Sequence, residues 1–125
     1  MYQSNLAIKD LDKIIDSFIP DTISFLQEII KFPSTRGNEG PVNRFIYDAL
    51  KEYCDEAELI QIPSSFLNHP DYRWPINNFS YEDIQNVRLK FTPEEKRGKS
   101  LIINAHSDVV PASKNQIDAF NPKVI

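Results

Sequence analysis

The segment at residues 101–111, Leu-Ile-Ile-Asn-Ala-His-Ser-Asp-Val-Val-Pro, constrains the fold of this chain more than any other. An apolar run rich in isoleucine, with a basic loop before it and a proline after it, predicts a strand buried on both faces. Successive side chains of a strand point to opposite faces, so His106 and Asp108 are predicted to emerge on the same side. An imidazole and a carboxylate would then converge at a strand end, where a metal ion or a polarised water can bind.

Two structural interpretations of His106 and Asp108 stand beside the functional one. They can form a hydrogen-bonded structural pair at the strand end, or they can be two solvated residues of a turn, because so short a motif often occurs by chance. Ser107 is not expected to complete a catalytic triad with them, since neighbours in an extended strand point to opposite faces.

The longer string at residues 104–111 resembles the signature of the M20 metallopeptidases. That family groups acetylornithine deacetylase, succinyl-diaminopimelate desuccinylase, aminoacylase and related dipeptidases and carboxypeptidases. Three features upstream are similar to the family in content and in order: Ile-Ile-Lys-Phe-Pro-Ser at residues 29–34, Glu39-Gly40, and an amphipathic helix over residues 42–50. The chain departs from the family at Ala105, where glycine is frequent.

The resemblance implies metal-assisted amide hydrolysis on an N-acyl amino acid or a short peptide. Two divalent ions, usually zinc with cobalt or manganese as alternatives, would hold a bridging water, lower its pKa and polarise the substrate carbonyl, while a glutamate accepts the water's proton. His106 would be a metal ligand. Asp108 would be the catalytic carboxylate that orients His106, fixes its tautomer and raises its basicity.

The resemblance also implies an α/β fold, in which residues 1–125 are the N-terminal part of a three-layer α/β/α catalytic domain with a mixed sheet. The other metal ligands of the family follow the first His-x-Asp motif, so we expect this portion to be an incomplete domain that is inactive alone. The alternative is a non-catalytic remnant or interaction module of the same fold. The hydrolase interpretation predicts that the longer gene product contains an Asp, a Glu-Glu pair and a distal His, whereas the module interpretation predicts a stop after Ile125.

The hydrophobic periodicity predicts helices in the first half of the chain and strands in the second. Pro20 is expected to separate the first two helices, because proline is best tolerated in a first turn. Alternating apolar residues predict a half-buried strand at 87–91, which is expected to form an antiparallel hairpin with the strand at 101–106. The predicted helices are about 8–18, 20–31 and 41–53, the predicted strands are about 56–62, 87–91 and 101–106, and residues 63–85 are predicted to be a long loop.

Composition and charge limit the partners. A net charge of -4 argues against nucleic acid and against an anionic membrane surface. The sequence has no apolar stretch of membrane-spanning length and no signal peptide at residues 1–5, and its single cysteine excludes an internal disulfide, so a cytoplasmic location is expected. The expected partners are a small-molecule or short-peptide substrate and, through an incomplete sheet, further copies of the chain.

Two further residues are weaker candidates for chemistry. His69 stands beside Pro70 in the irregular region and is expected to be an exposed loop residue rather than a metal ligand. Cys54 follows an amphipathic helix, where a small hydrophobic side chain is expected, and no neighbouring base would activate it as a nucleophile.

Overall fold

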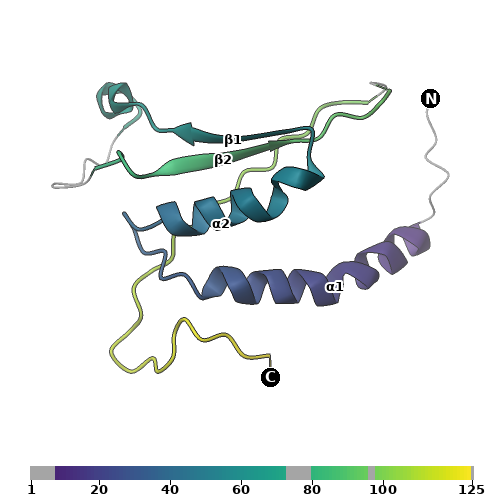
Figure 1. The fold of residues 1–125 in the computed structure, drawn as a ribbon, viewed down its shortest axis with the longest axis horizontal. Helices are drawn as coiled ribbons and strands as arrows, with labels where there is room; N and C mark the ends of the chain where they lie inside the picture. The colour runs from purple at the N-terminus through teal and green to yellow at the C-terminus, as the bar shows by residue number, and fades with distance from the viewer. Residues whose placement is uncertain (1–7, 73–79, 96–97, 125) are drawn as a thin grey trace.

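The computed structural model of this chain describes residues 8–72, 80–95 and 98–124. These residues form a mixed α/β arrangement of two helices and a two-stranded antiparallel sheet (Figure 1). Short 3₁₀ helices occupy Lys51–Tyr53 and Ser64–Asn68. The main elements, in chain order, are α1 (Ile8–Ile30), α2 (Gly40–Leu50), β1 (Glu56–Gln61) and β2 (Gln85–Lys90).

The sheet, α2 and α1 are stacked in that order (Figure 1). β1 and β2 pair without interruption, from Glu56 opposite Lys90 to Gln61 opposite Gln85. Side chains of β2 alternate between half-buried and exposed, as expected for a sheet with one covered face. The contacts of α2 with both strands identify it as the helix that covers this sheet.

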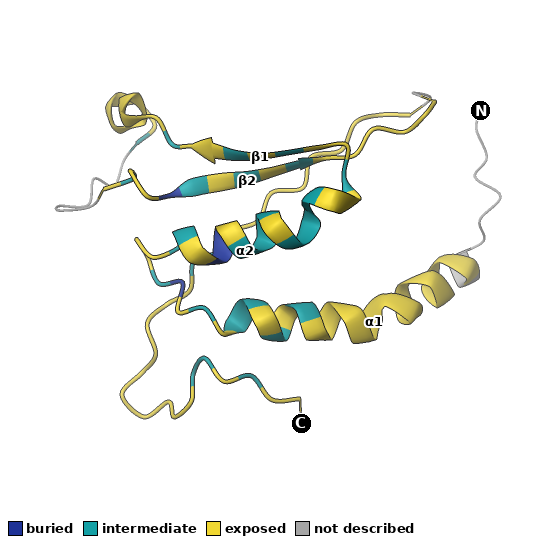
Figure 2. Cartoon of the chain, viewed as in Figure 1, coloured by how far each residue is buried: buried dark blue, intermediate teal, exposed yellow. Residues whose placement is uncertain are grey.

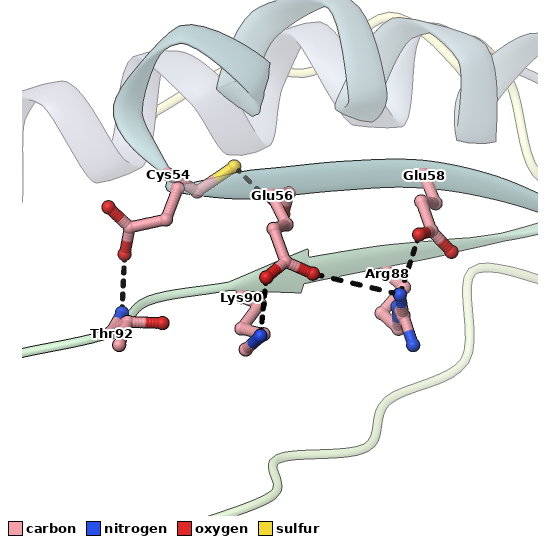
Figure 3. A network of polar contacts seen from close by, with 7 residues as sticks. Cys54, Glu56, Glu58, Arg88, Lys90 and Thr92 are labelled. Atoms are coloured by element: carbon pink, nitrogen blue, oxygen red, sulfur yellow. Dashed lines mark hydrogen bonds and ion pairs between the residues drawn. The ribbon is translucent and has the colours of Figure 1, made fainter.

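The uncovered face of the sheet carries complementary charges across the two strands (Figure 3). Lys90 pairs with Glu56, and the Arg88 guanidinium lies 2.6 Å from the Glu58 carboxylate and 4.0 Å from that of Glu56. Opposite charges facing each other across an antiparallel pair stabilise that register. These pairs give a physical reason why β2 takes β1 as its partner.

The densest packing lies around α2 and the start of β2 (Figure 2). Val42 is fully buried and Ile84 is 6% exposed. The Phe45 ring lies 5.7 Å from Phe25 and 5.3 Å from Phe32, measured between centroids, which joins α2 to the end of α1 and the residues that follow it. The first half of α1 is exposed (Figure 2).

The start of α2 is held close to the chain that enters β2. A Cβ added to Gly40 would lie 2.8 Å from the backbone oxygen of Asp83, which is closer than side-chain carbons approach. Glycine therefore permits this approach. The contact places the first turn of α2 beside the start of β2.

The prediction of two helices separated at Pro20 is wrong, because α1 continues through this residue. Proline lacks one N–H group, so the helix loses the hydrogen bond to the carbonyl of Asp16 while the apolar pattern continues on both sides. α1 bends in its N-terminal half (Figure 1), as expected for a helix with an internal proline.

The strand predicted at 101–106, and its hairpin with residues 87–91, are not formed. Residues 101–108 have no regular secondary structure, and Leu101, Ile102 and Ile103 are 81%, 90% and 85% exposed rather than buried. A strand requires hydrogen bonds to a neighbouring backbone, and β2 forms its described pairing with β1. The segment at residues 101–106 is apolar, but it does not pair with β2 as predicted.

The other elements lie close to their predicted ranges. α2 and the 3₁₀ helix after it span residues 40–53, while β1 and β2 span 56–61 and 85–90. The predicted loop at 63–85 contains the 3₁₀ helix Ser64–Asn68, and its residues 73–79 lie outside the described part. Within the described ranges, no helix combines the length and the apolar character needed to cross a bilayer.

Candidate functional site

The segment at residues 98–111 returns from the loop after β2 past the N-terminal end of α2 (Figure 1), and it contains His106 and Asp108. The imidazole Nδ1 of His106 lies 3.0 Å from the Asp108 carboxylate Oδ1 and 3.0 Å from the Asp108 backbone oxygen. The two side chains are therefore near enough to hydrogen bond, as predicted, but the strand end that was predicted to bring them together is not formed.

The hydrogen bonds of His106 assign its tautomer. Both partners of Nδ1 are oxygens, and with Asp108 ionised both of them act only as acceptors, so Nδ1 carries the proton and donates it. In the neutral ring, the lone pair is then on Nε2. The His106 side chain is 82% exposed and that of Asp108 is 47% exposed, so Nε2 is accessible to a ligand. A carboxylate behind a histidine is the usual arrangement at protein metal sites.

Ser34, which follows α1 and is 2% exposed, holds the backbone on both sides of Asp108. Its hydroxyl donates to the Ser107 carbonyl at 2.8 Å, and its own carbonyl accepts from the Val109 N–H at 3.0 Å. Thr35 and Val109 also form an isolated parallel bridge. The Asp108 backbone is therefore fixed at both of its neighbours by one buried residue.

Asn43 of α2 connects Ser107 to the sheet. The Ser107 hydroxyl donates to Asn43 Oδ1 at 2.7 Å, and Asn43 Nδ2 donates to the backbone oxygen of Gln85, the first residue of β2, at 2.8 Å. Asn43 is 7% exposed. The Ser107 hydroxyl binds Asn43 rather than His106, so Ser107, His106 and Asp108 are not arranged as a nucleophilic triad.

An open hollow of about 1550 Å³ lies between β2 and residues 98–108. His106 and Asp108 contribute to its lining together with four cationic residues, Arg36, Arg88, Lys90 and Lys99. The hollow separates the segment from β2, so the two backbones do not form a ladder.

His69 is an exposed loop residue and Cys54 is half-buried, as the sequence predicted. The Asp71 N–H donates to His69 Nδ1 at 3.2 Å, in an exposed loop. The half-buried thiol of Cys54 lies 3.5 Å from the Lys51 backbone oxygen and 3.4 Å from that of Glu56. Across residues 8–72, 80–95 and 98–124, no group of three or more His, Cys, Asp and Glu side chains could hold a metal ion.

Ser34 and Asn43 were not identified as site residues from the sequence. Ser34 closes the Phe-Pro-Ser string, but nothing in that string shows that its hydroxyl reaches a residue 73 positions later. Asn43 follows Val42 at the edge of the apolar stripe of α2. A polar residue at such an edge can be buried, and it then needs a hydrogen-bond partner, which is the one indication that the sequence offers.

No significant match to this chain was found among protein-family models, curated proteins or solved structures. The resemblance to the M20 family therefore rests on the motifs quoted above.

Proposed function

We propose that this chain provides the first metal ligand of an M20-type zinc-dependent hydrolase that cleaves an amide bond of an N-acyl amino acid or a short peptide. The observation that carries the proposal is the hydrogen bond from His106 Nδ1 to Asp108, which leaves Nε2 exposed with its lone pair free. Neutral imidazole nitrogen is a preferred zinc ligand.

The residues present fit one ligand position of such a centre. His106 would bind the ion through Nε2, while Asp108 keeps the proton on Nδ1 and fixes the plane of the ring. Bound divalent ions would lower the pKa of a water and polarise the scissile carbonyl. A catalytic zinc ion needs about three protein ligands, so further ligands and the general-base glutamate must come from residues other than those described.

The exposed residues of the returning segment support a larger domain. Leu101, Ile102 and Ile103 follow each other along an extended chain, so their side chains point alternately to both sides and all three remain uncovered. Additional strands beside this segment and helices on both faces would bury them. This arrangement is the proposed three-layer α/β/α domain with a mixed sheet, and the 125-residue chain alone is proposed to be inactive.

The test begins with the nucleotide sequence downstream of codon 125. We expect it to encode an Asp, a Glu-Glu pair and a distal His in that order. The product of the whole reading frame, loaded with zinc, should hydrolyse members of a panel of N-acetyl amino acids and dipeptides. His106→Ala should abolish this activity, whereas His69→Ala, the matched histidine control, should retain it. A stop directly after codon 125, together with a folded chain that binds no zinc, would favour the non-catalytic module.

A further inference from the structure

We propose that Ser34 and Asn43 are positioning residues, which hold Asp108 against His106 through a buried polar clamp formed by Ser34, Asn43 and Ser107. The relevance of the polar clamp to hydrolysis rests on the function proposed above. Its effect on the geometry of His106 does not, and it can be measured in the isolated chain without metal.

The first argument is the contrast in burial between the polar clamp and the pair that it supports. The His106–Asp108 hydrogen bond is in contact with water, which competes for both partners, so this bond alone contributes little to its own geometry. Ser34 and Asn43 are almost completely buried, where a hydrogen bond is stronger and an unpaired polar group is costly. The buried part of the network therefore determines the position of the exposed part.

The second argument is the position of the contacts along the chain. Ser34 binds the carbonyl of Ser107 and the N–H of Val109, the backbone groups on the two sides of Asp108. Asn43 binds the Ser107 side chain and the backbone of Gln85, so the same short segment is tied to α2 and to β2. The segment after α1 thus binds both chain neighbours of Asp108, and α2 and β2 hold one of these neighbours, Ser107, through Asn43. None of these residues contacts His106 in a described hydrogen bond.

The consequence is a preference for one tautomer. With Asp108 held in place, its carboxylate and carbonyl both accept from Nδ1, and the lone pair of the neutral His106 ring is on Nε2. When the segment is released, water replaces Asp108 at Nδ1, and the ring reverts toward the Nε2–H form that free histidine favours. The polar clamp therefore keeps Nε2 in the state that can bind a metal ion.

Nitrogen NMR of the His106 imidazole in the metal-free chain tests this, together with exchange of the Val109 amide. Ser34→Ala, Asn43→Ala and Ser107→Ala should each shift the ring toward Nε2–H. Ser34→Ala keeps the backbone carbonyl that accepts from the Val109 N–H but removes the hydroxyl bond to the Ser107 carbonyl. The loosened segment should exchange its Val109 amide about fivefold faster, the factor that corresponds to about 1 kcal/mol for the lost bond. Ser107→Thr keeps the hydroxyl and should restore the tautomer, whereas the exposed control Ser113→Ala should change neither reading.

Amides of β1 and β2 in the same spectra report whether each variant is folded. Ser107→Ala removes only a half-buried hydroxyl. If Ser34→Ala or Asn43→Ala unfolds the chain, the His106 tautomer of Ser107→Ala is compared with that of Ser107→Thr. A folded Ser107→Ala variant with an unchanged His106 tautomer would overturn the proposal. Because no metal and no activity enters this measurement, its outcome is independent of the hydrolase assignment.

Discussion

A neutral imidazole can bind a metal ion only through the ring nitrogen that carries no proton. The carboxylate and the backbone oxygen of Asp108 both accept from His106 Nδ1, which therefore carries the proton. The opposite arrangement occurs at His69, whose Nδ1 accepts from the Asp71 N–H. The described hydrogen bonds of the two neutral rings thus favour opposite tautomers, with the proton on Nδ1 in His106 and on Nε2 in His69.

Asp108 is expected to act through His106 rather than on substrate. In the zinc-loaded product of the complete reading frame, Asp108→Ala should lower metal affinity or activity about 10- to 100-fold, the usual effect of losing a carboxylate behind a ligating histidine. Zinc titration and hydrolysis rates measure this. Asp71→Ala, which removes the corresponding carboxylate beside His69, is the control and should have no effect. An equal loss in both variants would contradict the role of Asp108.

The described chain alone should bind zinc poorly. It offers one well-placed imidazole, whereas a catalytic site needs about three protein ligands. Calorimetry with zinc should show either no heat or a weak event that disappears in His106→Ala. A tight site with one zinc per chain would contradict this expectation and would direct attention to His69 and Cys54.

Elements that depend on local sequence were predictable, and contacts between distant residues were not. The stripe of α2 and the alternation along β2 report the local conformation, so both lie near their predicted ranges. The pairing of β2 with β1 depends on the match of Glu56 and Glu58 with Lys90 and Arg88, which an element-by-element analysis does not compare.

In the candidate site, too, the contact between near neighbours was predictable and the contacts between distant residues were not. His106 and Asp108 are two residues apart, so the sequence was sufficient to predict their contact. Ser34 and Asn43 reach Ser107 from 73 and 64 positions away, and only the fold brings them together. The order of elements along the chain does not reveal such contacts.

The charged pairs between β1 and β2 make their pairing sensitive to acid. The pKa of Glu56 is lowered, first by the hydrogen bond from Lys90 and then by the charges of Lys90 and Arg88 (Figure 3). A carboxyl group with a lowered pKa in the folded state stabilises that state above its unfolded pKa, and this contribution is lost as the pH falls through the folded value.

Thermal unfolding followed between pH 7 and pH 3 should therefore show a loss of stability below about pH 4.5, near the ordinary glutamate pKa. Glu56→Gln should flatten this dependence, because the amide cannot ionise. Glu94→Gln, in the exposed loop after β2, is the control and should leave the profile unchanged. A Glu56→Gln profile identical to that of the original chain would contradict the contribution of these pairs.

The described part of the chain leaves many large apolar side chains exposed, among them Phe91 at 67%, Val110 at 84% and Ile117 at 87%. Much of the exposed apolar surface belongs to α1, including Ile15 and Phe18, and to residues 101–103. Surface of this extent is expected to be covered by further polypeptide.

The isolated chain should consequently self-associate. Sedimentation over a concentration series should show species larger than a monomer that become more abundant with concentration, because uncovered apolar segments and sheet edges pair with other chains. Ile102→Lys should weaken the association, and Lys114→Arg, an exposed conservative change, should not. A monomer at every concentration that unfolds cooperatively would instead favour the non-catalytic module.

Asp108 is proposed to keep the Nε2 lone pair of His106 available for a metal ion. Nitrogen NMR of the two imidazoles, before and after addition of zinc, tests this role. We predict that His106 is protonated on Nδ1 and His69 on Nε2, and that zinc at high concentration shifts Nε2 of His106 while leaving His69 unchanged. A His106 ring protonated on Nε2, or a zinc response confined to His69, would contradict the account.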